Sequence, residues 1–527
     1  MTDNKTIRLL CTSDVHGKVF PHSYVDGSRI DLGFARLKTY FDSIRDEGTV
    51  LIDNGDVLVG SPFQLYHMMN YPLDSTKLSP VTIAMGEIGY DFMNLGNHDF
   101  NYGATTLFNH IKGVGSKCIT QNVSFKSDDS EEGVPIPDYV SPHDDNAEHN
   151  SKPYDLIDRL GKKIAIFGLV THFVPHWENE EHIKGFTFYE ALETAKKIVE
   201  VIKNDGKADY IVCVYHGGFE YNPETDEPMG LDNGENQGYK ILNEIPEIDV
   251  FFTGHQHLTL KGDKYLQPGE GGALVSCTEI DIETGEVRTS LIKVDEEADS
   301  KMLEKLQEEE NKCQIWLDEI IGESKQDILI HDEFEDRLHK SQLVTYINQA
   351  QMAYTDADIS AVALFSGATG LGKNITIRQM VSTYVFPDNL VVKRITGKTL
   401  RSYLEKNFEY WIIEDGEIKV NPKYCVPTPQ HFNYDMLDGV EYTAKISNPV
   451  GERIISLTRD GIPVTDDMVF SIVLSNYRAA GGGNFFMISE AETIWQDSNS
   501  ILDILIKDVT EKKIIEFDPV NNIKIII

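Results

Sequence analysis

The sequence predicts a mixed α/β (α+β) protein built from two domains, and three observations support this. The first is length, because 527 residues exceed what one hydrophobic core normally supports. The second is the alternation of short apolar runs with segments of helical spacing in the N-terminal half. The third is a charged helical stretch near residue 300, beyond which a second mixed pattern begins.

Six short apolar runs in the N-terminal half are predicted to form buried strands. Each is rich in branched or aromatic residues and is bounded by Gly, Asp or Asn. The intervening segments 34–48 and 189–206 have helical spacing and end in glycine. Strands that alternate with helices predict a central sheet. The six runs are TIRLLCT, GTVLIDN, DFMNL, KIAIFGLV, DYIVCVYH and DVFFTG.

The charged stretch DSKMLEKLQEEENKCQIWLDEIIGE is predicted to be a helix that joins the two domains. We therefore place the first domain at residues 1–298, a helical linker at 299–330 and the second domain at 331–527. Residues 126–152 are acidic, contain prolines and have almost no apolar pattern, which predicts a surface insertion.

The net charge of −37 disfavours a nucleic acid polymer as partner, because such a surface repels polyanions. It would also repel a small phosphate ester unless the site held local positive charge, which bound divalent metals supply. No apolar run approaches the roughly 18 residues that cross a bilayer, so no membrane partner is expected.

The N-terminus and the cysteines together predict a cytoplasmic protein. The first residues enter a strand-like run without the basic and apolar regions of a signal peptide. The six cysteines are scattered and form no CxxC pair, so we expect buried free thiols in a reducing compartment.

Five of the six predicted strands lead into side chains that bind metals in proteins. Loops beyond strand ends meet at one edge of an α/β sheet, so these side chains are expected to gather. In chain order they are Asp14 and His16 after the first strand, Asp56 after the second, Asn97 and His98 after the third, His216 at the end of the fifth, and His255 and His257 after the sixth.

Oxygen and imidazole ligands without thiolate suit Mn, Zn, Fe or Co. The ligands are too many for one ion but suit two divalent ions, about 3.5–4 Å apart, that share a carboxylate. Each motif alone could be an ordinary polar turn. Five such motifs that each follow a strand predict a dinuclear metal site.

The ordered motifs SDVHG, NGD, GNHD, YHGG and GHQH resemble those of the calcineurin-like metallophosphoesterases, and within them the nucleotidases with a C-terminal nucleotide-binding domain. The resemblance implies a four-layer sandwich for the first domain and a smaller α/β nucleotide-binding second domain. It implies these roles: Asp14, His16 and His257 bind one ion; Asn97, His216 and His255 bind the other; Asp56 bridges both; and His98 is a catalytic residue that binds no metal.

The resemblance also implies hydrolysis of nucleotide phosphate esters, in which a metal-bridging hydroxide attacks phosphorus and His98 assists the leaving group. Asn101 stands where the 5′-nucleotidase branch carries Asp, and this resembles the branch that acts on 2′,3′-cyclic nucleotides. We therefore expect a 2′,3′-cyclic-nucleotide 2′-phosphodiesterase with 3′-nucleotidase activity. The alternatives are a 5′-nucleotidase or nucleotide-sugar hydrolase, and a catalytically dead binding protein, although no ligand is lost.

The nucleobase is the remaining part of the expected substrate. The resemblance implies that two aromatic rings of the second domain hold it, and the matching positions are Phe432 and Tyr477, with Tyr434 as an alternative to Phe432. The residues alone favour a turn packed by core aromatics, since glycines 481–483 are flanked by aromatic residues. The expected partner is a small nucleotide, and the chain is expected to act as a monomer.

Overall fold

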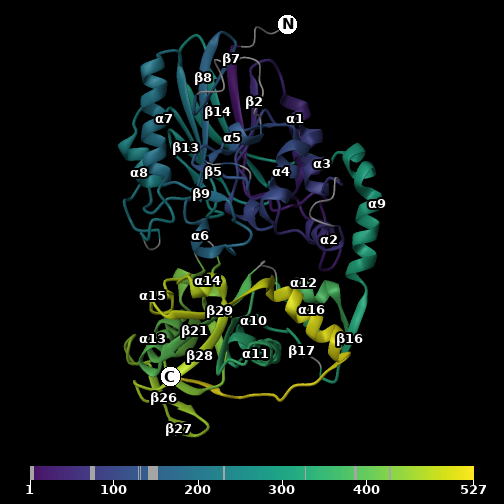
Figure 1. Cartoon of the computed structure of the whole chain (residues 1–527), viewed down its shortest axis with the longest axis vertical. Helices are drawn as coiled ribbons and strands as arrows, with labels where there is room; N and C mark the ends of the chain where they lie inside the picture. The colour runs from purple at the N-terminus through teal and green to yellow at the C-terminus, as the bar shows by residue number, and fades with distance from the viewer. Residues whose placement is uncertain are drawn as a thin grey trace. The chain divides into compact units, whose positions relative to one another are not determined.

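The computed structural model of the chain contains two compact units, Met1–Cys313 and Gln314–Ile527 (Figure 1). Residues 129, 131 and 141–151 of the predicted surface insertion lie outside the described residues. The structure describes residues 5–71, 77–128, 130, 132–140, 152–229, 232–326, 328–384, 388–425 and 429–527.

The first three predicted strands lie in one six-stranded sheet of the N-terminal unit. In spatial order its strands are β15 (Val287–Lys293), β14 (Leu274–Asp281), β1 (Thr6–Thr12), β2 (Thr49–Asp53), β3 (Phe92–Met93) and β4 (Lys117–Cys118). Strands β1 to β4 run parallel, whereas β14 is antiparallel to both β1 and β15. The carboxyl ends of β1, β2 and β3 therefore meet at one edge of this sheet.

The other three predicted strands lie in a second six-stranded sheet. In spatial order its strands are β12 (Thr259–Lys261), β13 (Tyr265–Pro268), β11 (Val250–Thr253), β10 (Tyr210–His216), β8 (Lys162–Val170) and β7 (Asp155–Arg159). Strands β8, β10, β11 and β13 run parallel, and the edge strands β7 and β12 are antiparallel to their neighbours.

All six predicted strands form, but they divide between two sheets rather than building one central sheet. Alternate side chains of the two sheets form a shared apolar core, with Leu9 and Ile52 from one and Ile166, Val214 and Phe252 from the other. The sequence shows that each strand is buried on both faces, but burial alone does not determine which strands pair.

Helices cover the outer faces of the two sheets and complete the four-layer sandwich (Figure 1). The helices α7 (Ala191–Asp205) and α8 (Gly238–Glu244) pack on the second sheet. The helices α1 (Phe34–Ile44), α3 (Pro80–Ile88) and α4 (Gly103–Val114) lie beside the first sheet. The two helices predicted in this unit are α1 and α7, and Gly206 ends α7 in the left-handed conformation.

Shorter elements complete the N-terminal unit, and two of them are needed for the site: the 3-10 helix η1 (Asn97–Phe100) and the single-turn helix α6 (Val174–Trp177). The others are α2 (Pro62–Asn70), α5 (Ile136–Val140), and a three-stranded sheet of β6 (Val134–Pro135), β5 (Val123–Phe125) and β9 (Phe186–Phe188).

Helix α9 (Ser300–Leu317) lies within the stretch that we predicted as a helical linker, and the strands β16 (Ile320–Ser324) and β17 (Ile328–Leu329) follow it. The main sheet of the C-terminal unit has five strands: β24 (Asp435–Asp438), β18 (Ile359–Ala363), β28 (Val469–Ser475), β21 (Asn389–Thr396) and β29 (Glu492–Ser500). Its helices are α10 (Glu333–Leu338), α11 (Gln342–Thr355), α12 (Ile377–Thr383), α13 (Gly397–Asn407), α14 (Asn476–Ala479), α15 (Phe486–Ser489) and α16 (Ile501–Lys512), and its 3-10 helices are η2 (Phe408–Tyr410), η3 (Pro422–Tyr424) and η4 (His431–Asn433).

Smaller sheets surround this main sheet of the C-terminal unit. One pairs β27 (Ile462–Pro463), β26 (Ile454–Arg459), β25 (Glu441–Lys445) and β31 (Ile523–Ile526). Others pair β20 (Asn374–Thr376) and β30 (Ile514–Ile515) with β16, β19 (Gly370–Leu371) with β17, and β22 (Trp411–Glu414) with β23 (Glu417–Val420). This unit is therefore also mixed α/β, as predicted.

All six cysteines are among the described residues and carry free thiols, as predicted, and five of them are buried. Within the described part of the chain, no helix combines the length and the apolar character needed to cross a membrane.

Candidate metal centre

Buried amide side chains join the two sheets at the ends of their strands. Asn54 follows β2 and donates hydrogen bonds to Ser13 Oγ at 3.3 Å and to the Tyr215 carbonyl at 3.2 Å. Asn94 follows β3 and donates to Asn54 Oδ1 at 3.0 Å and to the Leu169 carbonyl at 2.7 Å. Because the bonds to Tyr215 and Leu169 cross to the second sheet, the loops after β1, β2, β3, β10 and β11 open onto one common site.

Most of the predicted ligands have an unusual backbone conformation. A positive φ is uncommon for residues other than glycine and costs about 1–2 kcal/mol per residue. Such strain concentrates at functional sites, where surrounding contacts hold it. The ligands with φ between 52° and 70° are Asp14, His16, Asp56, His255 and His257.

Asp14, His16 and His257 form the first ligand cluster, in which one ligand atom from each residue lies within 4.8 Å of the others. The Nε2 atoms of His16 and His257 are 2.9 Å apart, and Asp14 Oδ1 is 3.4 Å from His257 Nε2. The structure thus brings together the three residues that we predicted for one ion.

Asp56, His216 and His255 form the second cluster, with the same limit of 4.8 Å between ligand atoms. Asp56 Oδ2 is 3.2 Å from His216 Nε2, and Asn97 Oδ1 is 2.8 Å from His255 Nδ1. His216 Nε2 also lies 3.8 Å from Asp14 Oδ1, so the two clusters are adjacent. All seven predicted ligands therefore converge. Asp56 belongs to the second cluster, and its role as a bridge between two ions stays a prediction.

Two of the imidazoles are oriented by backbone carbonyls. Val59 O lies 3.0 Å from His16 Nδ1, and Asn54 O lies 2.6 Å from His216 Nδ1. A carbonyl only accepts, so each Nδ1 carries a hydrogen, and in the neutral ring each Nε2 presents a lone pair to the cluster. His216 Nε2 is buried and has no hydrogen-bond partner among the described residues, as expected for a metal ligand.

A third imidazole is oriented by a carboxylate. His255 Nε2 lies 2.9 Å from Glu235 Oε1, which assigns its hydrogen to Nε2 and leaves the lone pair of Nδ1 facing Asn97 Oδ1. His255 Nδ1 and Asn97 Oδ1 are then two acceptors at hydrogen-bond distance with no hydrogen between them, an arrangement that a bound cation would stabilise. The residues present therefore fit divalent ions, and the donor set accepts Mn, Zn, Fe or Co.

The pKa shifts within the clusters also indicate that this site attracts positive charge. Burial opposes a charge on His216, but attraction by Asp56 and Asp14 outweighs it and raises the pKa of His216 to about 10. Burial also opposes ionisation of both carboxyls, yet His216 outweighs it and lowers the pKa of each. Burial, then repulsion by His257, lowers the pKa of His16 to about 4. A metal ion that binds here displaces the proton of His216.

His98 lies beside the clusters and belongs to neither. Its backbone N–H donates to Asp56 Oδ1 at 2.7 Å, and its half-buried ring lies 5.7 Å from the ring of His16, centroid to centroid. Its Nδ1 is 2.8 Å from Asn101 Oδ1. This position fits the predicted role of a catalytic residue that binds no metal.

Asp99, next in the chain, is turned away from His98 and is a backbone anchor. Its buried carboxylate accepts the N–H groups of Asp56 at 3.0 Å and Gly96 at 2.8 Å through Oδ2. Through Oδ1 it accepts those of Val57 at 3.0 Å and Leu58 at 3.2 Å. Asp99 thus fixes the loop after β2 against the loop after β3.

Two acidic residues that the sequence did not predict lie at the site. Glu235 contacts His255 as described above, and Glu270 Oε2 lies 3.9 Å from His257 Nδ1. Glu235 lies in a polar loop, and Glu270 follows two residues after β13, a strand that was not among the six predicted. Neither residue is part of a motif that distinguishes it from other surface carboxylates.

In the C-terminal unit, the Phe432 and Tyr477 rings lie together, with centroids 6.0 Å apart and planes at 72°. Both side chains are half-buried. The alternative, Tyr434, is fully buried and stacks on Tyr410 at 4.7 Å, which removes it from contact with a ligand. Since Phe432 and Tyr477 meet edge-on, a base that enters between them must turn one ring.

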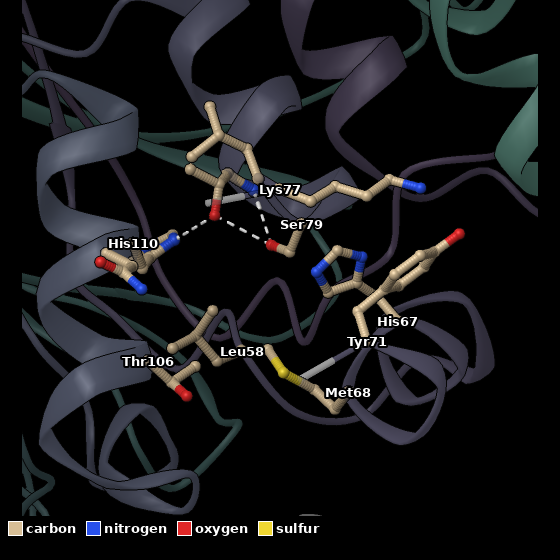
Figure 2. A pocket seen from close by; sticks show the side chains of 11 residues that line it. Leu58, His67, Met68, Tyr71, Lys77, Ser79, Thr106 and His110 are labelled. Carbon is tan, nitrogen blue, oxygen red and sulfur yellow. Dashed lines mark hydrogen bonds between the residues drawn. The ribbon is translucent and has the colours of Figure 1, made fainter. Parts of the chain in front are cut away.

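A separate cavity, partly open to solvent, lies between α2, α3 and α4 (Figure 2). His110 bonds Thr82 Oγ1 through Nδ1 at 2.8 Å, and its Nε2 has no hydrogen-bond partner among the described residues. The buried Thr106 hydroxyl likewise has no hydrogen-bond partner among the described residues. Such polar atoms favour bound water. None of the predicted site residues lines this cavity, so it is not part of the metal centre.

Comparison with protein families gives two matches. A model described as calcineurin-like phosphoesterase matches residues 7–258, and one described as 5′-nucleotidase, C-terminal domain, matches residues 320–490. A 2′,3′-cyclic-nucleotide 2′-phosphodiesterase/3′-nucleotidase of Salmonella typhimurium is 25% identical over 90% of this chain and 81% of its own length. A 5′-nucleotidase of Vibrio cholerae is 28% identical over 48% of this chain and 40% of its own length.

Among solved structures, a Staphylococcus aureus protein described as a 5′-nucleotidase, in complex with α-ketoglutarate, has a TM-score of 0.86 and 29% identity over 99% of both chains. A 5′-nucleotidase precursor from Thermus thermophilus has a TM-score of 0.62 and 20% identity, again over 99% of both chains, and shares the fold.

Asp99→Asn tests the anchor between the two loops. Whichever way the amide turns, its NH₂ group faces backbone N–H groups that have lost an acceptor. The free energy of unfolding of the metal-free protein is therefore expected to fall by about 2–5 kcal/mol. Denaturant titration measures this, with the exposed Asp263→Asn as the matched control. Equal unfolding midpoints for the two variants would contradict the role of Asp99.

Asp56→Asn tests the shared carboxylate. The wild-type protein is expected to hold two divalent ions per chain after loading with Mn²⁺ and removal of free metal. The variant is expected to hold one or none, because both ions lose a charged ligand. Elemental analysis measures the stoichiometry and also shows which metal the protein retains from cells. Two ions in the Asp56→Asn protein would rule out Asp56 as the bridge.

Proposed function

We propose that this chain, which belongs to the calcineurin-like phosphoesterases with a 5′-nucleotidase C-terminal domain, acts on 2′,3′-cyclic nucleotides and on the 3′-nucleotides that they yield. It is a phosphoric ester hydrolase, and its relatives include enzymes named for both cyclic and simple nucleotides. The observation that carries the proposal is the pair of adjacent ligand clusters, with the backbone of His98 bonded to the shared Asp56.

The ligand roles in this proposal are those that the sequence motifs predict, and the two clusters support them. Asp14, His16 and His257 would hold one divalent ion, and Asn97, His216 and His255 would hold the other, with Asp56 as a shared ligand. When bound, such a pair polarises the phosphoryl group and makes hydroxide available near neutral pH. The two ions also supply the local positive charge that the acidic surface lacks.

His98 is the side chain that we propose as the proton donor in the reaction. Hydrolysis of a 2′,3′-cyclic nucleotide forms a phosphorus–oxygen bond to water and breaks the bond to the ribose 2′ oxygen. The departing alkoxide requires a proton. His98 supplies it from Nε2 when its ring carries hydrogen on both nitrogens, because Nδ1–H then donates to Asn101 Oδ1 and Nε2–H is left to donate to the substrate. The same group serves the 3′ oxygen when the 3′-nucleotide is hydrolysed to nucleoside and phosphate.

Phe432 and Tyr477 are the proposed contacts to the nucleobase. Stacking on aromatic rings accepts any base, because every base has a π-face. Arg478, next to Tyr477, is buried and bonds Asp435 through Nε at 2.7 Å, so it serves to hold this region rather than to bind phosphate.

A 5′-nucleotidase activity is the second candidate. It is favoured by the 29% identity to the Staphylococcus aureus protein over nearly the whole of both chains. The observation against it is Asn101, which places an amide rather than a carboxylate against His98 Nδ1.

A substrate panel separates these candidates. With Mn²⁺ present, 2′,3′-cyclic AMP is expected to yield 3′-AMP and then adenosine, and kcat/KM for 5′-AMP is expected to be much lower. Chromatography of the products measures both steps and shows which ester bond breaks. A preference for 5′-AMP over both other substrates would replace the leading proposal by the second candidate.

His98→Gln tests the proton donor. The variant is expected to lose about 100- to 10,000-fold in kcat on 2′,3′-cyclic AMP, because glutamine cannot give up a proton to the leaving oxygen. Metal content is expected to stay at the wild-type value, since His98 belongs to neither cluster. The exposed His339→Gln serves as control. Full turnover in the His98→Gln protein would remove His98 from the mechanism.

A further inference from the structure

We infer that Glu178 is a positioning residue that acts through Asn101 to determine which ring nitrogen of His98 carries hydrogen. The inference rests on the proposed role of His98 as proton donor. Glu178 directly follows helix α6, 77 positions away from Asn101 in the chain, and neither motif spacing nor the position of a strand identifies it.

The observation is a chain of side-chain contacts that leads away from the metal centre. His98 Nδ1 lies 2.8 Å from Asn101 Oδ1, and Asn101 Nδ2 donates to Glu178 Oε2. The other oxygen, Glu178 Oε1, accepts the backbone N–H of Asn179 and lies 2.8 Å from His182 Nδ1. The Glu178 side chain is only 6% exposed, so protein groups rather than water hold it in place.

The chemistry of these groups determines the direction of each hydrogen bond. An ionised carboxylate only accepts, so Asn101 must turn its NH₂ group toward Glu178 and its oxygen toward His98. That oxygen accepts the hydrogen of His98 Nδ1, which leaves Nε2 as the nitrogen free to exchange a proton with substrate. Glu178 thereby acts on an imidazole that it does not touch.

The same short segment contacts a second imidazole of the site. The Trp177 ring stacks on the ring of the predicted ligand His255, with centroids 5.6 Å apart and planes at 25°. Glu178 thus acts on the catalytic His98 through Asn101, and the preceding residue Trp177 contacts the predicted metal ligand His255 directly. Metal content therefore has to be measured in every variant of this segment, to separate the two effects.

Glu178→Gln reverses the relay while nearly preserving its shape. If the new amide keeps its oxygen toward Asn179 N–H and His182, its NH₂ group faces Asn101. Asn101 then turns over and presents NH₂ to His98 Nδ1, so the imidazole carries its single hydrogen on Nε2 and cannot take up the second hydrogen that it gives to the leaving group. We expect kcat on 2′,3′-cyclic AMP to fall by about 10- to 100-fold, with KM and metal content unchanged. The exposed neighbour variant Glu180→Gln is expected to match wild type.

The double variant Asn101→Asp with Glu178→Gln provides the decisive comparison. Its new carboxylate accepts from the new amide at position 178 on one side and from His98 Nδ1 on the other, so the original hydrogen position returns. The order amide–carboxylate is exchanged, and kcat is expected to recover to within about threefold of wild type. A side chain that served only to hold the fold would not be rescued by moving the charge to position 101. If kcat stays at the Glu178→Gln level while metal content and thermal stability match wild type, the inference is wrong.

A direct readout does not depend on turnover. In metal-free protein labelled with ¹⁵N-histidine, the His98 signals are identified by their loss in His98→Gln. The wild-type protein and the double variant are expected to carry hydrogen on Nδ1, and Glu178→Gln on Nε2. The same tautomer in all three proteins would overturn the inference.

Simple esters separate failure of the relay from failure of the proposed nucleotide substrate. The p-nitrophenolate anion leaves without a proton, whereas phenolate benefits from one. Glu178→Gln is therefore expected to slow phenyl phosphate more than p-nitrophenyl phosphate. If wild type cleaves both esters but no nucleotide, the substrate proposal fails and this ratio still decides for or against Glu178. Equal loss on both esters counts against the relay.

Discussion

The Asp99 carboxylate holds together the two loops that carry the shared ligand and the catalytic imidazole. It accepts backbone N–H groups on both sides of the gap between these loops. The loops approach so closely that a Cβ atom on Gly55 would lie 2.1 Å from the backbone nitrogen of Gly96, so a larger residue cannot occupy that position. With this contact in place, the Asp56 carboxylate receives the N–H of His98. The positions of ligand and proton donor are thus coupled through the backbone.

The second constraint is the conformation of the ligands themselves. Five of them have a positive φ, and each such residue opposes folding by a small amount. Buried amides between the two sheets offset that strain, because Asn54 and Asn94 donate hydrogen bonds to the Tyr215 and Leu169 carbonyls of the other sheet. The local conformation therefore depends on the packing of the whole N-terminal unit.

Much of the site could be read from the sequence, because each ligand follows a strand at a short and regular distance. The strands and helices were predicted for a related reason, since apolar runs and helical spacing are local patterns. The pairing of the strands into two sheets was not predicted, because it depends on contacts between residues far apart in the sequence, such as Ile52 and Val214. Asp99 lies within the motif GNHD, yet the direction of its side chain depends on the 3-10 helix η1, which the sequence pattern does not predict. Glu178, Glu235 and Glu270 lie in irregular loops, where only the folded chain brings them to the site.

The carbonyl bonds to His16 and His216 have a consequence for how the protein acquires its metals. In a zinc finger the unbound ligands are scattered, and the ion itself drives the chain to fold. Here the main chain aims each imidazole through a carbonyl, that of Val59 for His16 and that of Asn54 for His216, so the ring orientation does not depend on a bond to an ion. An ion is therefore expected to bind and leave without refolding of the chain around it.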